Sequence, residues 1–267
     1  RIIINGFDLS TKAQCLEVKP INYYSSERKE ILPYIPQGIK KVLDIGCATG
    51  HFGLALKREL GVEEVVGIEV VPEIAKIAKK NLDKVFVGNI EEDDFPLEEN
   101  YFDLITCCDV LEHTENPVIV LRKLTQYLKP YGHVIISIPN IQYWGTIYNL
   151  SFGRWDYQDA GILDITHLKF YTKNKLQEFI RASGLLTNNI SPLTIALEGY
   201  VPRDNNGKIQ IGKVMIENVS DAEYEAFRTF QYIAIAQKIP TELNEINEQV
   251  HKLLRSRNID LLFELTK

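Results

Sequence analysis

Five apolar runs alternate with helical segments in the first half of the chain, and this alternation constrains the fold more than any other feature. The runs cover Lys40–Asp44, Glu63–Val71, Lys84–Ile90, Phe102–Cys108 and His133–Ile138. Nearly all their residues are apolar, which is typical of strands buried on both faces. Strands that alternate with helices predict an α/β fold, with a mostly parallel sheet and helices on both of its sides.

The second half continues this pattern and adds a tail. Lys173–Ser183 predicts a helix, and Phe230–Gln237 predicts a late strand, which we expect to be antiparallel and at the edge of the sheet. After a main domain of residues 1–240, residues 241–267 predict an amphipathic helix that packs on the body or on a second subunit, so a homodimer is left open. The apolar face of that helix consists of Leu243, Ile246, Val250 and Leu253.

Composition and charge exclude few classes of protein. The 267 residues include 30 basic and 36 acidic side chains, and the net charge of −6 weakly disfavours binding to nucleic acid or to an anionic membrane. The four cysteines form no CxxC pair, so we expect a reduced, cytoplasmic protein. No apolar run approaches about 18 residues, and no transmembrane helix is predicted. The first residue is Arg1, which leaves a removed leading segment open.

A glycine-rich loop follows the first apolar run. In the segment DIGCATG, Asp44, Gly46 and Gly50 form the pattern D-x-G-x-x-x-G, in which glycine admits positive φ and lets the backbone approach a ligand closely. The alternative is a plain tight turn. The spacing is not that of the dinucleotide fingerprint. Glu69 lies near the end of the second run, where a carboxylate can accept hydrogen bonds from both hydroxyls of a ribose.

Together the loop and Glu69 resemble the class I S-adenosylmethionine-dependent methyltransferases. The resemblance implies a Rossmann-like, doubly wound sheet of seven strands, a loop that holds the methionine end of the cofactor, and Glu69 on its ribose. It also implies that an N-terminal cap, residues 1–38, closes over the cofactor through Tyr23 and Tyr24, although these two rings could simply pack. The expected cofactor-binding residues are Tyr24, Asp44, Gly46, Cys47, Gly50, His51, Phe52, Glu69, Val70, Asn89, Ile90 and Cys107.

An acidic turn, CDVLEHTENP, follows the fourth run. If it forms one helical turn, Asp109 faces both Glu112 and His113, at the edge of the sheet where open α/β folds bind ligands. A solvated turn with capping carboxylates is the alternative. The segment resembles the E-V-L-E-H segment of ubiquinone-pathway O-methyltransferases and the E-x-x-E-H segment of small-RNA 2′-O-methyltransferases. That resemblance implies a divalent metal, Mg, Mn or Zn, bound by Asp109, Glu112, His113 and His167, although Asp109 is one methylene shorter than the usual Glu.

A segment rich in Trp, Tyr and Asn follows the fifth run, and we expect residues 140–172 to form a lid. Aromatic rings with polar edges suit a sugar, and an aromatic mini-core is the alternative. The pieces SIPN, GRW and GILDITHLKFYT resemble bacterial methyltransferases of surface-polysaccharide synthesis, over about residues 20–240. This resemblance implies methylation of a sugar hydroxyl. The expected acceptor-binding residues are Asn140, Tyr143, Trp144, Arg154, Trp155, Tyr157 and Asp164.

His167 is the expected general base. Its apolar neighbours Ile165, Leu168 and Phe170 suit a buried strand, in which a histidine would only need a hydrogen-bond partner. However, a sugar hydroxyl is too weak an acid to ionise at pH 7, so a base or a metal must assist its methylation. We therefore assign catalysis to His167, His113, Asp109 and Glu112, with His167 as either base or metal ligand, and expect Asp164 to orient the histidine or the lid.

The sequence thus predicts an S-adenosylmethionine-dependent O-methyltransferase that acts on a sugar or glycan. One alternative acceptor is an RNA 2′-hydroxyl or a small phenol. An alternative of another class is a non-catalytic, cofactor-binding partner in a glycan-assembly complex. The sequence names neither the sugar nor the oligomeric state.

Overall fold

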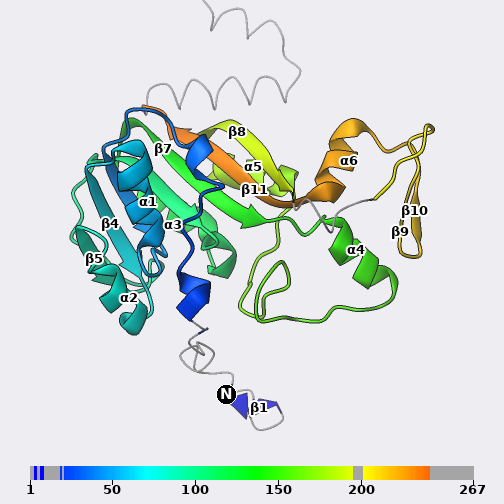
Figure 1. Cartoon of the computed structure of the whole chain (residues 1–267), viewed down its shortest axis with the longest axis horizontal. Coiled ribbons are helices and arrows are strands. Elements are labelled where there is room, and N and C mark those ends of the chain that lie inside the picture. The colour runs from blue at the N-terminus through cyan, green and yellow to red at the C-terminus, as the bar shows by residue number, and fades with distance from the viewer. Residues whose placement is uncertain (1–2, 5–6, 9–18, 20, 195–200, 241–267) are drawn as a thin grey trace, which may run out of the picture.

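A seven-stranded sheet forms the centre of the protein, in the order β5-β4-β3-β6-β7-β11-β8 (Figure 1). The computed structural model describes residues 3–4, 7–8, 19, 21–194 and 201–240, so the predicted C-terminal helix lies outside the described residues. The five strands from β5 to β7 are parallel, and β11 is antiparallel to both β7 and β8. This confirms the predicted Rossmann-like α/β fold. The strands are β3 Lys41–Ile45, β4 Glu64–Glu69, β5 Lys84–Val87, β6 Phe102–Cys108, β7 Leu128–Pro139, β8 Leu185–Thr194 and β11 Thr229–Lys238.

Helices cross between the parallel strands and begin and end at residues that suit these positions. Pro72 and Pro117 open two of them, because the amide N–H that proline lacks would have no partner in the first turn. Gly61 ends another with a left-handed φ of 65°. These helices are α1 His51–Leu60, α2 Pro72–Ala78, α3 Pro117–Thr125 and α5 Lys173–Ala182. Short 3-10 turns lie at η2 Ile21–Tyr24, η3 Leu32–Tyr34 and η4 Leu111–His113.

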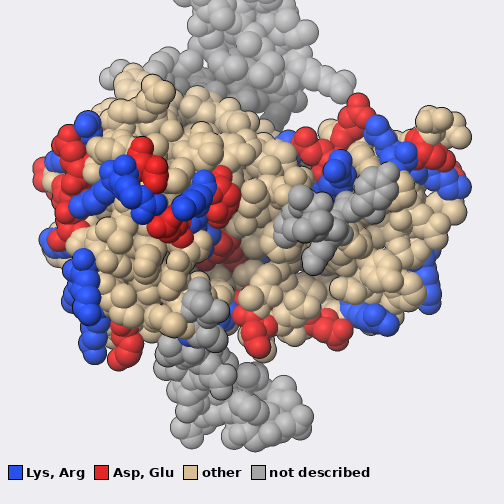
Figure 2. Space-filling view, viewed as in Figure 1, with Lys and Arg blue, Asp and Glu red and all other residues tan. Residues whose placement is uncertain are grey.

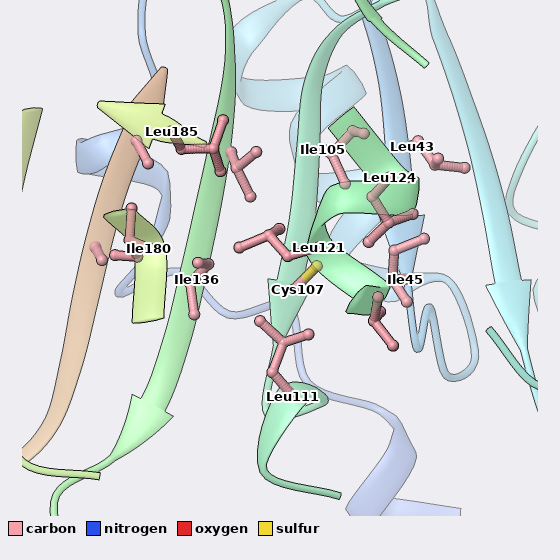
Figure 3. Packing of buried hydrophobic residues seen from close by; sticks show 14 of the residues in the cluster. Leu43, Ile45, Ile105, Cys107, Leu111, Leu121, Leu124, Ile136, Ile180 and Leu185 are labelled. Carbon is pink, nitrogen blue, oxygen red and sulfur yellow. The ribbon is translucent and has the colours of Figure 1, made fainter. Parts of the chain in front are cut away.

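Alternate residues of each central strand face opposite sides of the sheet, and both sides are buried. On one side, side chains of β3, β6 and β7 pack with α3 and α5 (Figure 3). On the other side, Val42, Leu104 and Ile135 pack with α1, α2 and the N-terminal segment. Because the helices cover both faces, a ligand has access to the sheet only at its ends.

The predicted edge position of the late strand was wrong. β11 lies between β7 and β8, and β8 is the edge strand. The sequence did not predict β8 because its residues LLTNNISPLT are polar and half-exposed, as an edge strand permits, and so lack the apolar run that marks the central strands.

A small satellite with its own apolar core adjoins the sheet beyond β7 and β11 (Figure 1). It contains α4 Trp144–Ser151, the hairpin of β9 Ile209–Ile211 and β10 Val214–Ile216, and α6 Asp221–Arg228. A separate hairpin, β1 Ile3–Ile4 with β2 Phe7–Asp8, lies near the N-terminus. In the part of the chain that the structure describes, no helix is long and apolar enough to cross a membrane. Lys and Arg are interspersed with Asp and Glu on the face shown in Figure 2.

Candidate active site

The glycine-rich loop turns sharply between β3 and α1. Gly46, Ala48 and Gly50 all have positive φ, of 66°, 50° and 80°. A side chain at Gly46 would place its Cβ 2.6 Å from the Val110 side chain, so only glycine fits there. The loop is held to β4 because the N–H groups of Gly46 and Cys47 both donate to the carbonyl of Ile68. The close approach of the backbone forms an open cradle at the carboxyl end of the sheet.

Two buried carboxylates flank this cradle. Asp44 accepts a hydrogen bond from the Thr106 hydroxyl at 2.6 Å, and burial raises the pKa of Asp44 to about 6. Glu69 accepts hydrogen bonds from the N–H groups of Ala48 (2.9 Å) and Val71 (3.0 Å), while burial raises its pKa. Each oxygen of Glu69 keeps a lone pair for a further donor, such as a ribose hydroxyl.

Val70 follows Glu69 and leaves 44% of its surface exposed, next to an otherwise buried strand end. An apolar side chain in that place suits the face of a planar ring. Asn89 lies at the start of the next turn, where its side-chain oxygen accepts from the N–H of Glu91, and the Asp93 carboxylate accepts from the N–H of Asn89. The neighbouring Ile90 is buried in the core.

A pocket opens between the cradle and the N-terminal segment. It includes five of the predicted cofactor-binding residues, namely Tyr24, Asp44, Gly46, Cys47 and Phe52. Cys107 is not among them. Side chains alternate along a strand, so Cys107 points into the core and Cys108 lines the pocket instead. Three further lining residues, Tyr23, Ser26 and Arg28, come from the N-terminal segment, and no sequence pattern assigned Ser26 or Arg28 to the site.

We call Lys19 and residues 21–28 the strap, because they cross the mouth of the pocket and contact both of its sides. On the loop side, the Tyr24 carbonyl accepts hydrogen bonds from the Thr49 N–H (3.2 Å) and hydroxyl (2.5 Å). The same hydroxyl contacts His51 Nδ1 at 2.7 Å. On the opposite side, Arg28 Nη1 lies 2.6 Å from Asp109 Oδ2.

Asp109 does not join Glu112 and His113 as predicted. Its φ of 55° ends the strand sharply, and the 3-10 turn η4 begins only at Leu111, so the expected helical spacing does not exist. The carboxylate of Asp109 is instead bonded to Arg28 and to Gln231, from the strap and β11. Its observed partners make it an anchor for the strap.

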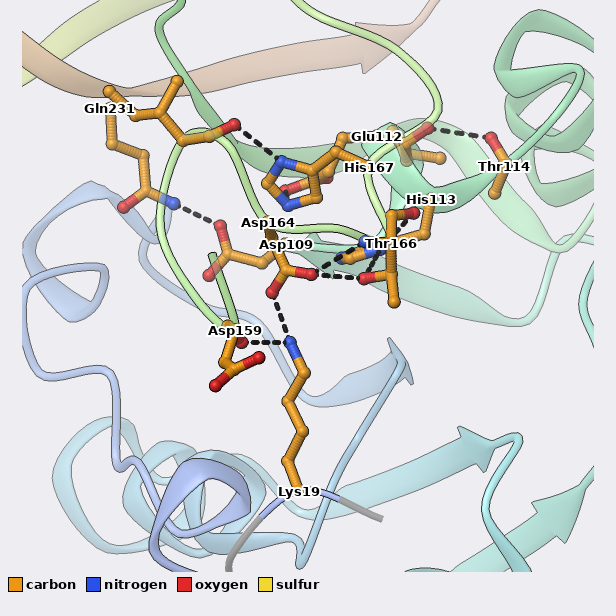
Figure 4. A network of polar contacts seen from close by, with 12 residues as sticks. Lys19, Asp109, Glu112, His113, Thr114, Asp159, Asp164, Thr166, His167 and Gln231 are labelled. Atoms are coloured by element: carbon orange, nitrogen blue, oxygen red, sulfur yellow. Dashed lines mark hydrogen bonds and ion pairs between the residues drawn. The ribbon is translucent and has the colours of Figure 1, made fainter. Parts of the chain in front are cut away.

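Glu112, His113 and His167 do converge (Figure 4), and we call them the histidine–carboxylate centre. One ligand atom from each lies within 4.8 Å of the others. His167 Nε2 is 3.9 Å from Glu112 Oε1, and the two imidazole rings are 4.7 Å apart in an edge-to-face arrangement. Burial lowers the pKa of both histidines and raises the pKa of Glu112 well above its usual range, so the site favours neutral groups.

Hydrogen bonds orient both imidazoles toward this centre. His167 Nδ1 lies 3.0 Å from the carbonyl of Ile162, which can only accept, so Nδ1 holds the proton and Nε2 presents a lone pair. His113 Nδ1 lies 3.2 Å from the carbonyl of Thr166, with the same consequence. In contrast, both carboxylate oxygens of Glu112 are buried without a hydrogen-bond partner. Three electron-pair donors therefore face one another.

The loop that contains His167 is attached directly to the turn that contains Glu112. The N–H groups of Leu168 and Lys169 donate to the Glu112 carbonyl at 2.8 and 3.0 Å. The alternative of a buried strand does not hold, because Ile165 and Leu168 are 67% and 50% exposed. Phe170 is half-buried, and its ring lies 6.4 Å from that of His167 and 5.9 Å from that of Trp155.

The predicted acceptor-binding residues fall into two groups. Arg154, Trp155 and Tyr157 are exposed on the lid loop, and Trp155 reaches the centre through Phe170. In contrast, Asn140 is fully buried, and its side chain bonds to the backbone of Ala226, Thr229 and Gln142. Asp164 is also buried. Tyr143 packs against Phe230, and Trp144 packs on the satellite core.

Comparisons with known proteins agree with this fold and show the family of the chain. A family model described as a methyltransferase domain matches residues 19–187, which include the strap, the loop and the histidine–carboxylate centre. Two structures of S-adenosylmethionine-dependent methyltransferases are similar in fold. The one from Thermotoga maritima has a TM-score of 0.55 at 18% identity and covers 82% of this chain and 91% of its own. The one from Archaeoglobus fulgidus has a TM-score of 0.53 at 20% identity, covering 82% and 95%.

Relatives in sequence are named for ubiquinone biosynthesis. The mitochondrial ubiquinone biosynthesis O-methyltransferase of Schizosaccharomyces pombe is 29% identical over 157 residues, 57% of each chain. The enzyme of that name from Acinetobacter baylyi is 31% identical over 107 residues, 38% of this chain and 44% of its own. The chain thus spans about half the length of the curated relatives it matches. One relative is mitochondrial by name, and the expected cytoplasmic location stays a prediction.

Proposed function

The chain belongs to the methyltransferase-domain family, and from this premise we propose that it transfers the methyl group of S-adenosylmethionine to a hydroxyl oxygen. The family implies the cofactor, and the pocket between loop and strap suits it. Glu69 has lone pairs for the ribose hydroxyls, exposed Val70 suits the adenine face, and the glycine cradle lets the methionine end approach the backbone.

The histidine–carboxylate centre supports oxygen as the acceptor atom. It adjoins the cofactor pocket, since Arg28 lines that pocket and bonds to Asp109, which comes just before the turn containing Glu112 and His113. A neutral imidazole with a free Nε2 is a suitable base for a proton that leaves as a bond forms. An acceptor atom that is nucleophilic without losing a proton would not need such a base. The arrangement of His113, His167 and Glu112 is the observation on which this proposal most depends.

The reaction we propose is a direct, in-line transfer. The acceptor oxygen attacks the sulfonium methyl, the new O–C bond forms as the C–S bond breaks, and S-adenosylhomocysteine leaves. His167 Nε2 accepts the hydroxyl proton during this step, while the carbonyl of Ile162 holds the ring by its Nδ1–H. The sulfonium is already activated, so the remaining task of the protein is alignment of the two reactants.

The centre also fits a divalent cation. Glu112 has two buried oxygens without partners, and such an orphaned carboxylate is costly unless a cation or a proton satisfies it. Both imidazoles present Nε2 and donate Nδ1–H to backbone carbonyls, as metal-binding histidines commonly do. Glu112, His113 and His167 would hold the ion, and Asp109 would stay with Arg28. When bound, such an ion lowers the pKa of a coordinated hydroxyl. Metal analysis of the protein before and after dialysis against a chelator tests this second role.

A sugar hydroxyl is our first candidate acceptor. One support is the centre itself, because an alcohol needs base or metal assistance. Another is the exposed Trp155, which lies next to Phe170 and through it next to His167, and which suits the apolar face of a sugar. The second candidate is a phenol, which the names of the ubiquinone-biosynthesis relatives favour. These relatives are not named for polysaccharide synthesis, and that more specific role stays a prediction. RNA methylation stays an alternative hypothesis, whereas the match to the methyltransferase-domain family speaks against a purely cofactor-binding role.

One experiment tests the proposed reaction. Purified protein is given labelled S-adenosylmethionine with panels of nucleotide sugars, glycans and phenols, and the same panels are given to His167→Gln and, as a control, to His133→Gln on β7. We expect label transfer to one acceptor class, a loss of at least about 100-fold in kcat for His167→Gln, and unchanged binding of S-adenosylhomocysteine by calorimetry. Near-normal turnover of His167→Gln refutes the base, and failure to bind S-adenosylhomocysteine refutes the cofactor.

A further inference from the structure

Lys19 of the strap reaches into the lid and contacts a buried carboxylate. Its ammonium group donates to Asp164 Oδ2, and it also donates to the carbonyl of Asp159 at 2.6 Å (Figure 4). Asp164 is 1% exposed, so it has no surface to offer to an acceptor molecule. Its carboxylate accepts from the Lys19 ammonium and from the N–H and hydroxyl of Thr166, which are the contacts of an ionised carboxylate. A buried, ionised aspartate at this place requires the strap lysine as its counter-ion.

Asp164 fixes the direction of the next hydrogen bond. Its Oδ1 atom accepts from the N–H of Thr166 at 2.9 Å and from the Thr166 hydroxyl at 2.7 Å. A hydroxyl has only one proton, and here that proton is directed to a carboxylate. The lone pairs of the Thr166 oxygen are therefore left to accept a hydrogen bond from another group.

That other group is His113. The Thr166 hydroxyl oxygen lies 3.0 Å from His113 Nδ1, and the Thr166 carbonyl lies 3.2 Å from the same nitrogen. Both oxygens act as acceptors toward it, so His113 holds its proton on Nδ1 and keeps the lone pair of Nε2 free. The His113 ring also offers one ligand atom within 4.8 Å of those of Glu112 and His167. Without the ionised aspartate, the Thr166 hydroxyl could turn and donate to Nδ1, and only the Thr166 carbonyl would then oppose the Nε2–H tautomer.

We propose that Lys19, Asp164 and Thr166 form a positioning relay that holds His113 as its Nδ1–H tautomer and is complete only when the strap lies against the lid. The strap is also bonded to the cofactor loop, through the Tyr24 carbonyl and Thr49. One segment therefore joins the cofactor loop to the relay. Only the expected effect of the relay on turnover rests on the proposed function. The tautomer of His113 is a property of the protein alone.

Nitrogen-15 NMR of labelled histidine tests the relay without any substrate. The chain has five histidines, and a His113→Gln spectrum assigns the signal. We expect wild type to show His113 protonated at Nδ1, and Asp164→Ala to show a measurable share of the Nε2–H form, because the freed Thr166 hydroxyl can then donate to Nδ1. The double variant Asp164→Ala/Thr166→Val should regain the Nδ1–H form, since the Thr166 carbonyl is then the acceptor that faces Nδ1. Thr125→Val, which removes a hydroxyl of the same kind from α3, is the matched control. An unchanged His113 tautomer in Asp164→Ala overturns the proposal.

Kinetics test the contribution of the strap, and they also serve if Asp164→Ala fails to fold. We expect Lys19→Met to lower kcat about 10-fold or more with the KM for S-adenosylmethionine within a factor of two, as for other residues that orient a working histidine. Lys19→Arg should recover most of the loss, and Lys76→Met on the surface of α2 should change nothing. A wild-type kcat in Lys19→Met overturns the role of the strap. If the wild type has no turnover at all, the proposed function fails, while the NMR result still decides the relay.

Discussion

Burial of the Asp44 carboxyl beneath the cofactor loop destabilises the folded protein at neutral pH. Burial raises its pKa from 3.8 to about 6, so folding favours the protonated carboxyl. The stability contribution of a group with a raised pKa is fully present below pH 3.8 and is lost as pH rises through about 6. The shift of about two pH units corresponds to about 3 kcal/mol at neutral pH.

We therefore predict that Asp44→Asn is the more stable protein at pH 7.5 in the absence of cofactor. The advantage should approach about 3 kcal/mol at pH 7.5 and nearly vanish at pH 4, because the amide can still accept from Thr106 and never ionises. Urea unfolding of both proteins at the two pH values measures the difference. Glu112 also has a raised pKa but is present in both proteins, so its effect cancels. An advantage that does not depend on pH would contradict the argument.

Residues of the site could be predicted where their neighbours in the sequence fix their position in the fold. Glu112 and His113 are adjacent in a turn at the end of a strand, and the pattern alone put them at the mouth of the sheet. The pairing with His167 depended on a resemblance. Arg28 and Lys19 carried no local signal, because each gains its role from a partner far along the chain. Asp109 was placed wrongly because a positive φ in a non-glycine residue cannot be read from spacing.

Among the elements, β4 supports the cofactor loop from below through Gly67. A Cβ added to Gly67 would lie 2.5 Å from Cys47 Sγ and 2.8 Å from Leu82 Cδ1. Cys47 lies in the cradle and lines the pocket, so the added methyl must displace the loop. Because Gly67 of β4 has no side chain, the cofactor loop that follows β3 can pack against it.

We predict that Gly67→Ala weakens binding of S-adenosylhomocysteine by about 10-fold or more and costs about 1–3 kcal/mol of stability, as overpacked positions usually do. Gly61→Ala is the control. At Gly61 no atom lies within 4 Å of an added Cβ, and the left-handed φ of 65° alone makes alanine cost about 1 kcal/mol. Calorimetric titration and urea unfolding separate the two effects. Equal affinities of the two variants would show that Gly67 does not position the loop.

The elements that sequence patterns did not predict are those with weak apolar periodicity. β8 is half-exposed, and α4 lies inside the expected lid, for which no helix was predicted. No element was predicted between Ser183 and Phe230, although Ser220 and Glu223 form a capping box that opens α6. That four-residue signature was present in the sequence and could have located the helix. In contrast, all five parallel strands were found because burial on both faces requires continuous apolar runs, although β7 begins at Leu128, before the predicted His133, and β5 ends at Val87, before the predicted Ile90.

At the scale of the whole molecule, the strap makes the cofactor side and the acceptor side of the site depend on each other. It contacts the loop through Tyr24, the end of β6 through Arg28–Asp109, and the lid through Lys19–Asp164. The satellite contributes none of these contacts and has a core of its own. A ligand that fills the pocket should therefore stabilise the strap, the loop and the lid, and leave the satellite hairpin unchanged.

Hydrogen exchange measured with and without S-adenosylhomocysteine tests this division. We predict slower exchange with ligand in the strap, in loop residues 46–50 and around Thr166, and unchanged exchange in β9 and β10. The central strands β3 and β6 should exchange slowest in both states, since they are buried on both faces. Lys19→Met removes the contact between the strap and Asp164 of the lid. In this variant the ligand should still slow exchange in the loop but no longer in the lid. Protection that stays confined to the loop in the wild type would mean that the strap does not connect the two sides of the site.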